Sequence, residues 1–153
     1  MKKIVTLLAS QLEPFIKDDI VRPGMTAAER TQPGRKTFAL QEDDDVKAII
    51  CVAYGHSLPT NETELREMGF EYRQGDFFIV PYTMWSYSPG AGGDLIFALL
   101  ELIKTEYGEL SSGYSPRVAT MSPKTRVASR FHLKNGAKLL AENEESYNFE
   151  YKI

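Results

Sequence analysis

Residues 88–94 form a glycine-rich segment whose residue types suit the binding of a phosphate or diphosphate group. Gly90, Gly92 and Gly93 lack Cβ atoms, so the backbone N–H groups beside them can turn toward a ligand. The apolar spacing that begins at Leu95 predicts a helix after the glycines, and a helix N-terminus attracts anions. The same glycines are also typical of a tight strand-to-helix turn. No Gly-Lys-Ser/Thr follows and no repeated βαβ units surround the segment, which argues against a Walker loop and a dinucleotide fingerprint.

His132 and Ser122 are the side chains whose types suit proton transfer or hydrogen bonding at a reacting carbonyl group. A histidine titrates near neutral pH, so it can act as an acid or as a base. Ser122 can donate a hydrogen bond, but nothing in the sequence places a base to activate it as a nucleophile. Both residues also have a structural interpretation. A histidine after Phe131 on a helix is typical of a packed core residue, and Ser122 before Pro123 is typical of a helix cap.

Length and composition narrow the class of protein. The chain has 153 residues, 25% of them charged, with 18 Lys+Arg against 21 Asp+Glu. This size favours one domain over residues 1–153, and a net charge of −3 supplies no cationic field for nucleic acid. No run of 18 apolar residues is present, so we expect no contact with a membrane. Because the N-terminus also lacks the pattern of a signal peptide, we expect a cytoplasmic protein.

Metal and disulfide chemistry are not expected from the sequence. Cys51 is the only cysteine, so no intrachain disulfide can form. The two histidines, His56 and His132, lie far from Cys51 along the chain and do not form a zinc-ligand pattern. The acidic run at 42–45 is typical of a solvated turn.

The candidate chemical groups must be positioned by a set of predicted strands. Apolar runs and alternating patterns predict strands over 3–9, 36–40, 46–54, 77–86, 117–121 and 147–153. Pro81 interrupts the fourth of these strands and cannot donate a ladder hydrogen bond. It therefore indicates a bulge or a point where two strands part.

Helices are predicted between these strands. They are short pieces within 10–34, a turn or two capped by Thr60 or Asn61, Leu95–Gly108, and part of 124–140. The last of them is expected to end near Asn135-Gly136, a typical left-handed C-cap pair. This mixed order of strands and helices predicts an α/β or α+β layered domain.

The order glycine loop, helix, short strand, helix and final strand resembles the GNAT superfamily of acyl-CoA-dependent acyltransferases. In that superfamily the helix after the glycine loop holds the diphosphate of coenzyme A. The resemblance implies a GNAT-like mixed, mainly antiparallel central sheet flanked by helices. It assigns the coenzyme A contacts to Ser88, Gly90, Ala91, Gly92, Gly93, Asp94 and Asn135. His132 occupies the position of a tyrosine in the superfamily's terminal signature, and Tyr87 stands where its loop usually carries Arg or Gln.

Residues 131–137, Phe-His-Leu-Lys-Asn-Gly-Ala, resemble a motif of malonyl-CoA decarboxylase, whose catalytic domain is itself GNAT-like. Supporting similarities follow the order of that family at 56–59, 85–88, 100–110, 120–123 and 147–151. In that family the motif histidine and the serine of a Ser-Pro pair are catalytic, which carries over to His132 and Ser122. The family has a long helical insertion between the two, where this chain has only Pro123–Arg130.

The resemblance implies an enzyme that uses a coenzyme A thioester, either acetyl-CoA or malonyl-CoA, and no metal. The first hypothesis is an acyltransferase with His132 as general acid and an unknown small-molecule or protein acceptor. The second is a compact malonyl-CoA decarboxylase-like enzyme that converts malonyl-CoA to acetyl-CoA, with Ser122 as a hydrogen-bond donor. The third is a GNAT-fold interaction module without catalysis. The short chain favours the first over the second, and a homodimer is compatible with all three.

Overall fold

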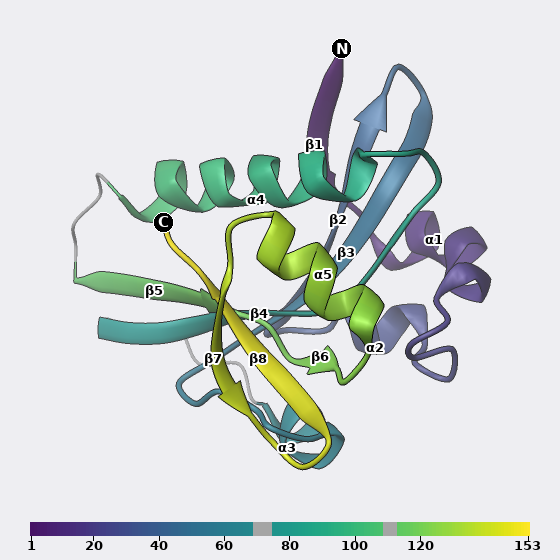
Figure 1. Ribbon diagram of the computed structural model, residues 1–153. Helices are drawn as coiled ribbons and strands as arrows, with labels where there is room; N and C mark the ends of the chain where they lie inside the picture. Colours follow the sequence, from purple (N-terminus) through teal and green to yellow (C-terminus); the bar gives the residue numbers. More distant parts are fainter. Residues whose placement is uncertain (69–74, 109–112) are drawn as a thin grey trace.

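The computed structural model describes residues 1–68, 75–108 and 113–153 as one open sheet with helices on both faces (Figure 1). The sheet has the strand order β1-β2-β3-β4-β5-β8-β6, and β7 also pairs with β8. Its strands are β1 (Lys2–Thr6), β2 (Arg35–Glu42), β3 (Asp45–Gly55), β4 (Gly75–Ser86), β5 (Tyr114–Ala119), β6 (Ser122–Pro123), β7 (Lys138–Glu142) and β8 (Ser146–Tyr151). All pairs are antiparallel except β4 with β5. The mixed, mainly antiparallel sheet is therefore confirmed.

The helices divide between the two faces of this sheet. They are α1 (Ala9–Leu12), the 3-10 helix η1 (Glu13–Asp18), α2 (Ala27–Thr31), α3 (Glu62–Glu67), α4 (Ala91–Tyr107) and α5 (Arg126–Lys134). The apolar side of α4 packs on one face, where Leu95 and Leu99 meet Ile50 and Val52 in the largest core cluster. The short helices α1, η1, α2 and α3 cover the other face in two smaller clusters. Figure 1 shows α5 lying beside the first turns of α4.

Strand β4 contains the irregularity that Pro81 predicts. Opposite Cys51 and Val52 of β3 the register shifts, because Thr83 pairs with Cys51 whereas Pro81 pairs with Val52, which leaves Tyr82 as the extra residue of a bulge. The ladder between β4 and β5 ends at Ile79. One further hydrogen bond, from the Met121 amide to the Pro81 carbonyl at 3.1 Å, precedes the point where the strands separate. Of the two alternatives for Pro81, the bulge is confirmed, whereas the regular ladder to β5 ends two residues before it, at Ile79.

Some element boundaries differ from those that the sequence predicts. Helix α4 starts at Ala91 rather than near Leu95, so the glycines form its first turn. Strand β7 was not expected, because its residues show no alternation of apolar and polar side chains. In the structure Leu139 and Leu140 are both largely exposed. Asn61 caps α3 as predicted, since its side chain accepts a hydrogen bond from the Glu64 amide at 2.8 Å. No helix among the described residues is long and apolar enough to cross a membrane.

Candidate active site

The glycine loop ends as the N-terminus of α4. Gly90 has φ +79°, the left-handed conformation that favours glycine, and no atom would lie within 4 Å of an added Cβ. The Ala91 amide donates to the Ser88 carbonyl and the Asp94 amide to the Gly90 carbonyl, both at 3.1 Å. Among the described residues, the amides of Gly92 and Gly93 donate to no other group. Two free N–H groups at the positive end of a 17-residue helix are suited to an anionic ligand.

Gly92 and Gly93 are also needed for the contact between α4 and α5. A Cβ on Gly93 would lie 2.8 Å from Oδ1 of Asn135, and one on Gly92 would lie 3.1 Å from the Phe131 ring. The Asn135 amide nitrogen donates to the Phe131 carbonyl at 2.8 Å, which holds the side chain against the loop. The predicted loop residues and Asn135 are therefore brought together. The packing of α5 against α4 therefore explains why Gly92 and Gly93 lack Cβ atoms, in addition to the access for a ligand that the sequence predicts.

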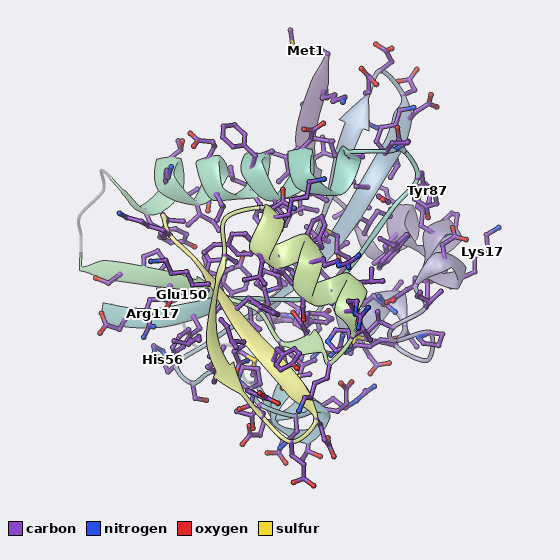
Figure 2. The ribbon with its side chains drawn as sticks, in the orientation of Figure 1. Met1, Lys17, His56, Tyr87, Arg117 and Glu150 are labelled. Atoms are coloured by element: carbon purple, nitrogen blue, oxygen red, sulfur yellow. The ribbon has the colours of Figure 1, made fainter. Side chains whose placement is uncertain are left out.

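Two other predicted loop residues have different partners. The carboxylate of Asp94 forms an exposed ion pair with Lys2 at 3.0 Å, and its amide is already bonded, so Asp94 offers no free donor to a phosphate. Tyr87 donates its hydroxyl to Asp18 at 2.7 Å and accepts from the Trp85 indole at 2.8 Å. Burial, together with the bond to Asp18, raises the pKa of Tyr87 to about 12. Tyr87, which Figure 2 shows on the segment that leads from β4 to α4, therefore ties this segment to η1.

His132 lies on α5 among aromatic side chains. Its ring stacks on Phe149 at a centroid distance of 5.3 Å, and its Nδ1 atom lies 2.7 Å from the hydroxyl of Tyr151. Burial lowers the pKa of His132 to about 4, so the ring is neutral at pH 7. Burial raises the pKa of Tyr151, which keeps the phenol protonated. A phenol is a better donor than a neutral imidazole, so we assign the shared hydrogen to Tyr151 and the ring hydrogen of His132 to Nε2.

Ser122 lies on β6, which pairs with β8. The register pairs Val118 with Tyr151 and Ser122 with Tyr147, so Ser122 shares the sheet face of the aromatic residues that His132 contacts. Its Oγ atom lies 2.7 Å from Oγ1 of Thr120, and no hydrogen bond joins it directly to His132 within the described parts of the chain. The two predicted catalytic side chains thus lie over the same face of the sheet, but Ser122 is opposite Tyr147 while His132 contacts Phe149 and Tyr151.

Ser122 is not the cap of α5. The side chain of Thr125 caps this helix, because it accepts a hydrogen bond from the Ala128 amide at 3.2 Å. The capping interpretation of Ser122 is therefore wrong, since the helix begins three residues further along the chain than that interpretation requires.

A cleft of about 300 Å³ opens at the other side of Ser122, between the η1–α2 loop, α3 and the turn that joins β7 to β8. Its polar lining residues include Arg22, Glu62, Arg66, Ser122, Glu145 and Ser146. The Ser146 hydroxyl donates to the Thr60 carbonyl at 2.6 Å, which fixes the β7–β8 turn against the segment before α3. Figure 1 shows this turn beside α3. Sequence reasoning did not predict these charged residues, because they come from three separate segments with no shared motif.

A buried ion pair holds the η1–α2 loop at this cleft. Asp19 and Arg30 are 1% and 0% exposed, and their charged atoms are 2.6 Å apart. The Asp19 carboxylate accepts hydrogen bonds from the amides of Val21 and Arg22, and Arg30 donates to the carbonyls of Arg22 and Met25. A buried pair of charges is stable only when hydrogen bonds satisfy its remaining atoms, as they do here. All of these bonds fix the backbone between residues 19 and 25.

Comparison with solved structures identifies the fold. Malonyl-CoA decarboxylase from Agrobacterium vitis matches with a TM-score of 0.63 and 19% identity over 86% of this chain. The PaiA N-acetyltransferase of Thermoplasma acidophilum, in complex with coenzyme A, matches with a TM-score of 0.60 and 11% identity, over 100% of this chain and 99% of that one. NAA60 of Arabidopsis thaliana, in complex with acetyl-CoA, gives 0.63 and 12%, over 100% of both chains.

The fold is therefore the GNAT fold that these acetyltransferases share with malonyl-CoA decarboxylase. This chain spans 36% of the Agrobacterium vitis decarboxylase and 60% of two others. No protein-family model matches the chain, and a sequence search of curated proteins gives no significant match.

Proposed function

We propose that the protein is an acyltransferase that takes its acyl group from a coenzyme A thioester. The observation that carries this proposal is the pair of free amides of Gly92 and Gly93 at the N-terminus of α4. They would bind the diphosphate of coenzyme A, as the helix N-terminus favours negative charge. The acyl group would then lie near the separation of β4 and β5, within reach of the surface that carries Ser122 and His132. The GNAT neighbours crystallised with coenzyme A or acetyl-CoA support this assignment.

His132 acts in this proposal as a hydrogen-bond donor rather than as the general acid expected from the sequence. A ring with a pKa of about 4 carries no spare proton at pH 7. Its Nε2–H group can still stabilise negative charge on the thioester oxygen, because a fixed neutral donor needs no reorganisation during the reaction. During transfer, the bond from the acceptor to the acyl carbon forms and the carbon–sulfur bond breaks. Coenzyme A leaves as a thiolate and takes up a proton equivalent to the one that the acceptor loses.

Decarboxylation of malonyl-CoA is the second candidate, and one observation favours it. The side chains of Ser122, on β6, and His132, on α5, lie over the same face of β8, as a catalytic pair would require. Loss of carbon dioxide leaves an enolate of acetyl-CoA, and its oxygen could be stabilised by the same Nε2–H group. The enolate carbon then takes up one proton to give acetyl-CoA. This reaction needs no acceptor, which separates it from acyl transfer.

Incubation of the purified protein with acetyl-CoA and malonyl-CoA, with and without an amine mixture, tests the proposal. We expect release of the coenzyme A thiol that depends on the amine. Acetyl-CoA formed from malonyl-CoA without an amine would instead establish the decarboxylase. If neither thioester binds or reacts at millimolar concentration, both reactions are excluded and the non-catalytic module is favoured.

A pair of His132 variants tests the proposed role of this side chain. His132→Gln keeps an N–H donor that does not titrate, and His132→Phe keeps only the ring. We expect His132→Phe to lower kcat by about 10²–10³-fold, as loss of an oxyanion donor does, and His132→Gln to retain more activity than His132→Phe. Equal activity of the two variants would contradict the role of a hydrogen-bond donor.

A further inference from the structure

We propose that the protein binds a small monovalent anion, of the size of chloride, in its interior between the guanidinium group of Arg35 and the phenol of Tyr82. Neither residue lines the cleft beside Ser122, and the inference does not depend on the proposed acyltransferase function. Arg35 is 5% exposed and Tyr82 is 2% exposed. Among the described residues, Nη1 of Arg35 and Oη of Tyr82 are the two buried side-chain atoms that lack a hydrogen-bond partner. Both atoms can donate, so one acceptor between them would satisfy both.

The strand register brings the two side chains to the same face of the sheet. Arg35 of β2 pairs with Ala53 of β3, and Ala53 pairs with Val80 of β4, so these three side chains share one face. Tyr82 packs in the same apolar cluster as Ala53 and Val80. Because the alanine between the two outer strands is small, Arg35 can extend over it toward β4. The Arg35 guanidinium lies 5.5 Å from the centroid of the Tyr82 ring.

Arg35 differs from the other two buried arginines in having no carboxylate beside it. Arg30 pairs with Asp19 at 2.6 Å, and Arg22 pairs with Glu62 at 3.1 Å. Arg35 forms no ion pair within the described parts of the chain. A buried charge without a counter-ion is strongly unfavourable. The charge of Arg35 therefore favours an anion over a neutral ligand.

Groups of the chain itself compensate this charge only in part. Nη2 of Arg35 donates to the carbonyl of Leu65 in the last turn of α3, and a carbonyl carries only a partial negative charge. Cys51 lies in the same apolar cluster, but burial raises the pKa of its thiol, so it stays neutral at pH 7. Nη1 of Arg35 keeps a free hydrogen-bond donor that an anion would occupy.

Tyr82 supplies the second donor. Burial raises the pKa of the Tyr82 phenol although Arg35 nearby opposes this effect, so the hydroxyl keeps its proton at pH 7. The residue is held in place on its backbone side, because Arg22 donates to its carbonyl at the bulge of β4. A water molecule could accept from both donors as well, but it would leave the charge of Arg35 without compensation. The structure therefore favours an anion.

The surroundings limit the size of this anion. The cluster around Tyr82 is formed mainly by apolar side chains, among them Leu65, Val80 and Met121. A carboxylate with an extended polar body would lose its hydration there without finding hydrogen-bond partners. Chloride and bromide suit a site with two donors, whereas gluconate is too large and too polar for it. Gluconate is therefore the reference anion for the test.

Thermal unfolding in sodium chloride and in sodium gluconate of equal ionic strength tests the inference, because a ligand of the folded state raises Tm. When about 300 mM gluconate is replaced by chloride, we expect Tm to rise by at least about 3 °C and to level off as the site fills. Bromide should give a rise of similar size. An equal Tm in chloride and in gluconate would overturn the inference.

Tyr82→Phe separates an anion from a water molecule or from a direct bond to Arg35. In gluconate this variant should be at least as stable as the parent chain, because it removes a buried hydroxyl without a partner. In chloride it should be less stable than the parent chain, because it loses one donor to the anion. The control Tyr147→Phe, in the core cluster on the other face of the sheet, should keep the full effect of chloride. An equal loss of Tm in both salts for Tyr82→Phe would overturn the inference.

Arg35→Met removes the charge, and it should abolish the effect of chloride on Tm. Its control is Arg117→Gln, at an exposed arginine that pairs with Glu150 (Figure 2), which should keep the effect. Crystals grown in bromide locate the ion directly. We expect anomalous signal between Nη1 of Arg35 and Oη of Tyr82 in the parent chain. A chloride effect that persists in Arg35→Met, or bromide found only at the protein surface, would contradict the assignment.

Discussion

The two sides of Ser122 differ in how they present polar groups. The α4–α5 side offers backbone amides and the neutral ring of His132. The cleft side offers arginines and glutamates held by a buried ion pair. The first arrangement suits a ligand that many proteins of this fold share, because backbone amides recognise only its anionic diphosphate group. The second suits discrimination among acceptors, because charges on side chains change with single substitutions.

The largest effect on the free energy of unfolding is expected at the Asp19–Arg30 ion pair, which supports the loop on the cleft side. Asp19→Ala leaves Arg30 buried without its counter-ion, and breaking such a pair costs about 3–5 kcal/mol of unfolding free energy. Urea denaturation followed by circular dichroism measures this loss. The control is Lys104→Ala, which removes an exposed pair with Glu101 and should cost less than about 1 kcal/mol. Equal losses in the two variants would show that the buried pair does not stabilise the loop.

The α4–α5 side is expected to respond to pH through His132. Its pKa is about 4 in the folded chain against 6.5 in a model peptide, so the unfolded chain binds more protons between these values. The stabilising effect of a neutral ring is complete above pH 6.5 and is lost as pH falls toward 4, by roughly 3 kcal/mol in total. Denaturation curves for His132→Phe should lack this part of the pH dependence. The control His56→Phe, at an exposed histidine, should keep it, and a slope equal in both variants would argue against burial of His132.

A smaller effect separates packing from ligand binding in the glycine loop. Gly93→Ala adds a Cβ 2.8 Å from Oδ1 of Asn135 and should destabilise the chain by about 1–3 kcal/mol. Combining it with Asn135→Ala should relieve the clash, because the Asn135 side chain is then removed. The alanine at position 93 should then stabilise the helix relative to glycine by about 1 kcal/mol. Gly24→Ala, where nothing lies within 4 Å, is the neutral control. If Asn135→Ala does not rescue stability in the double variant, the contact is not what requires a glycine.

Much of the fold and of the α4–α5 side could be predicted from the sequence, because each part is encoded in one short stretch. The glycines stand directly before the apolar spacing of α4 and form its first turn, and Pro81 marks the bulge of its own strand. The motif at 131–137 contains both His132 and Asn135.

The cleft could not be predicted, because its residues meet only after folding. Arg30 occurs in the polar segment Ala-Ala-Glu-Arg-Thr, which is typical of a solvent-exposed turn, yet its side chain is 0% exposed. Its burial depends on Asp19, eleven residues earlier in the chain. The neutral state of His132 was missed for a similar reason, since it results from tertiary contacts with Phe149 and Tyr151.

The central claim, that the N-terminus of α4 holds the diphosphate of an acyl-CoA, is tested most directly by calorimetric titration of acetyl-CoA into two variants. Gly90→Asn and Gly90→Asp have nearly the same shape, both residues tolerate the left-handed conformation better than most, and the site has open space for either. Only the aspartate adds a negative charge beside the free amides. The account predicts that Gly90→Asn binds acetyl-CoA within a few-fold of the parent chain and that Gly90→Asp binds at least tenfold more weakly. Equal affinity of the two variants, or no binding to the parent chain at millimolar acetyl-CoA, would contradict it.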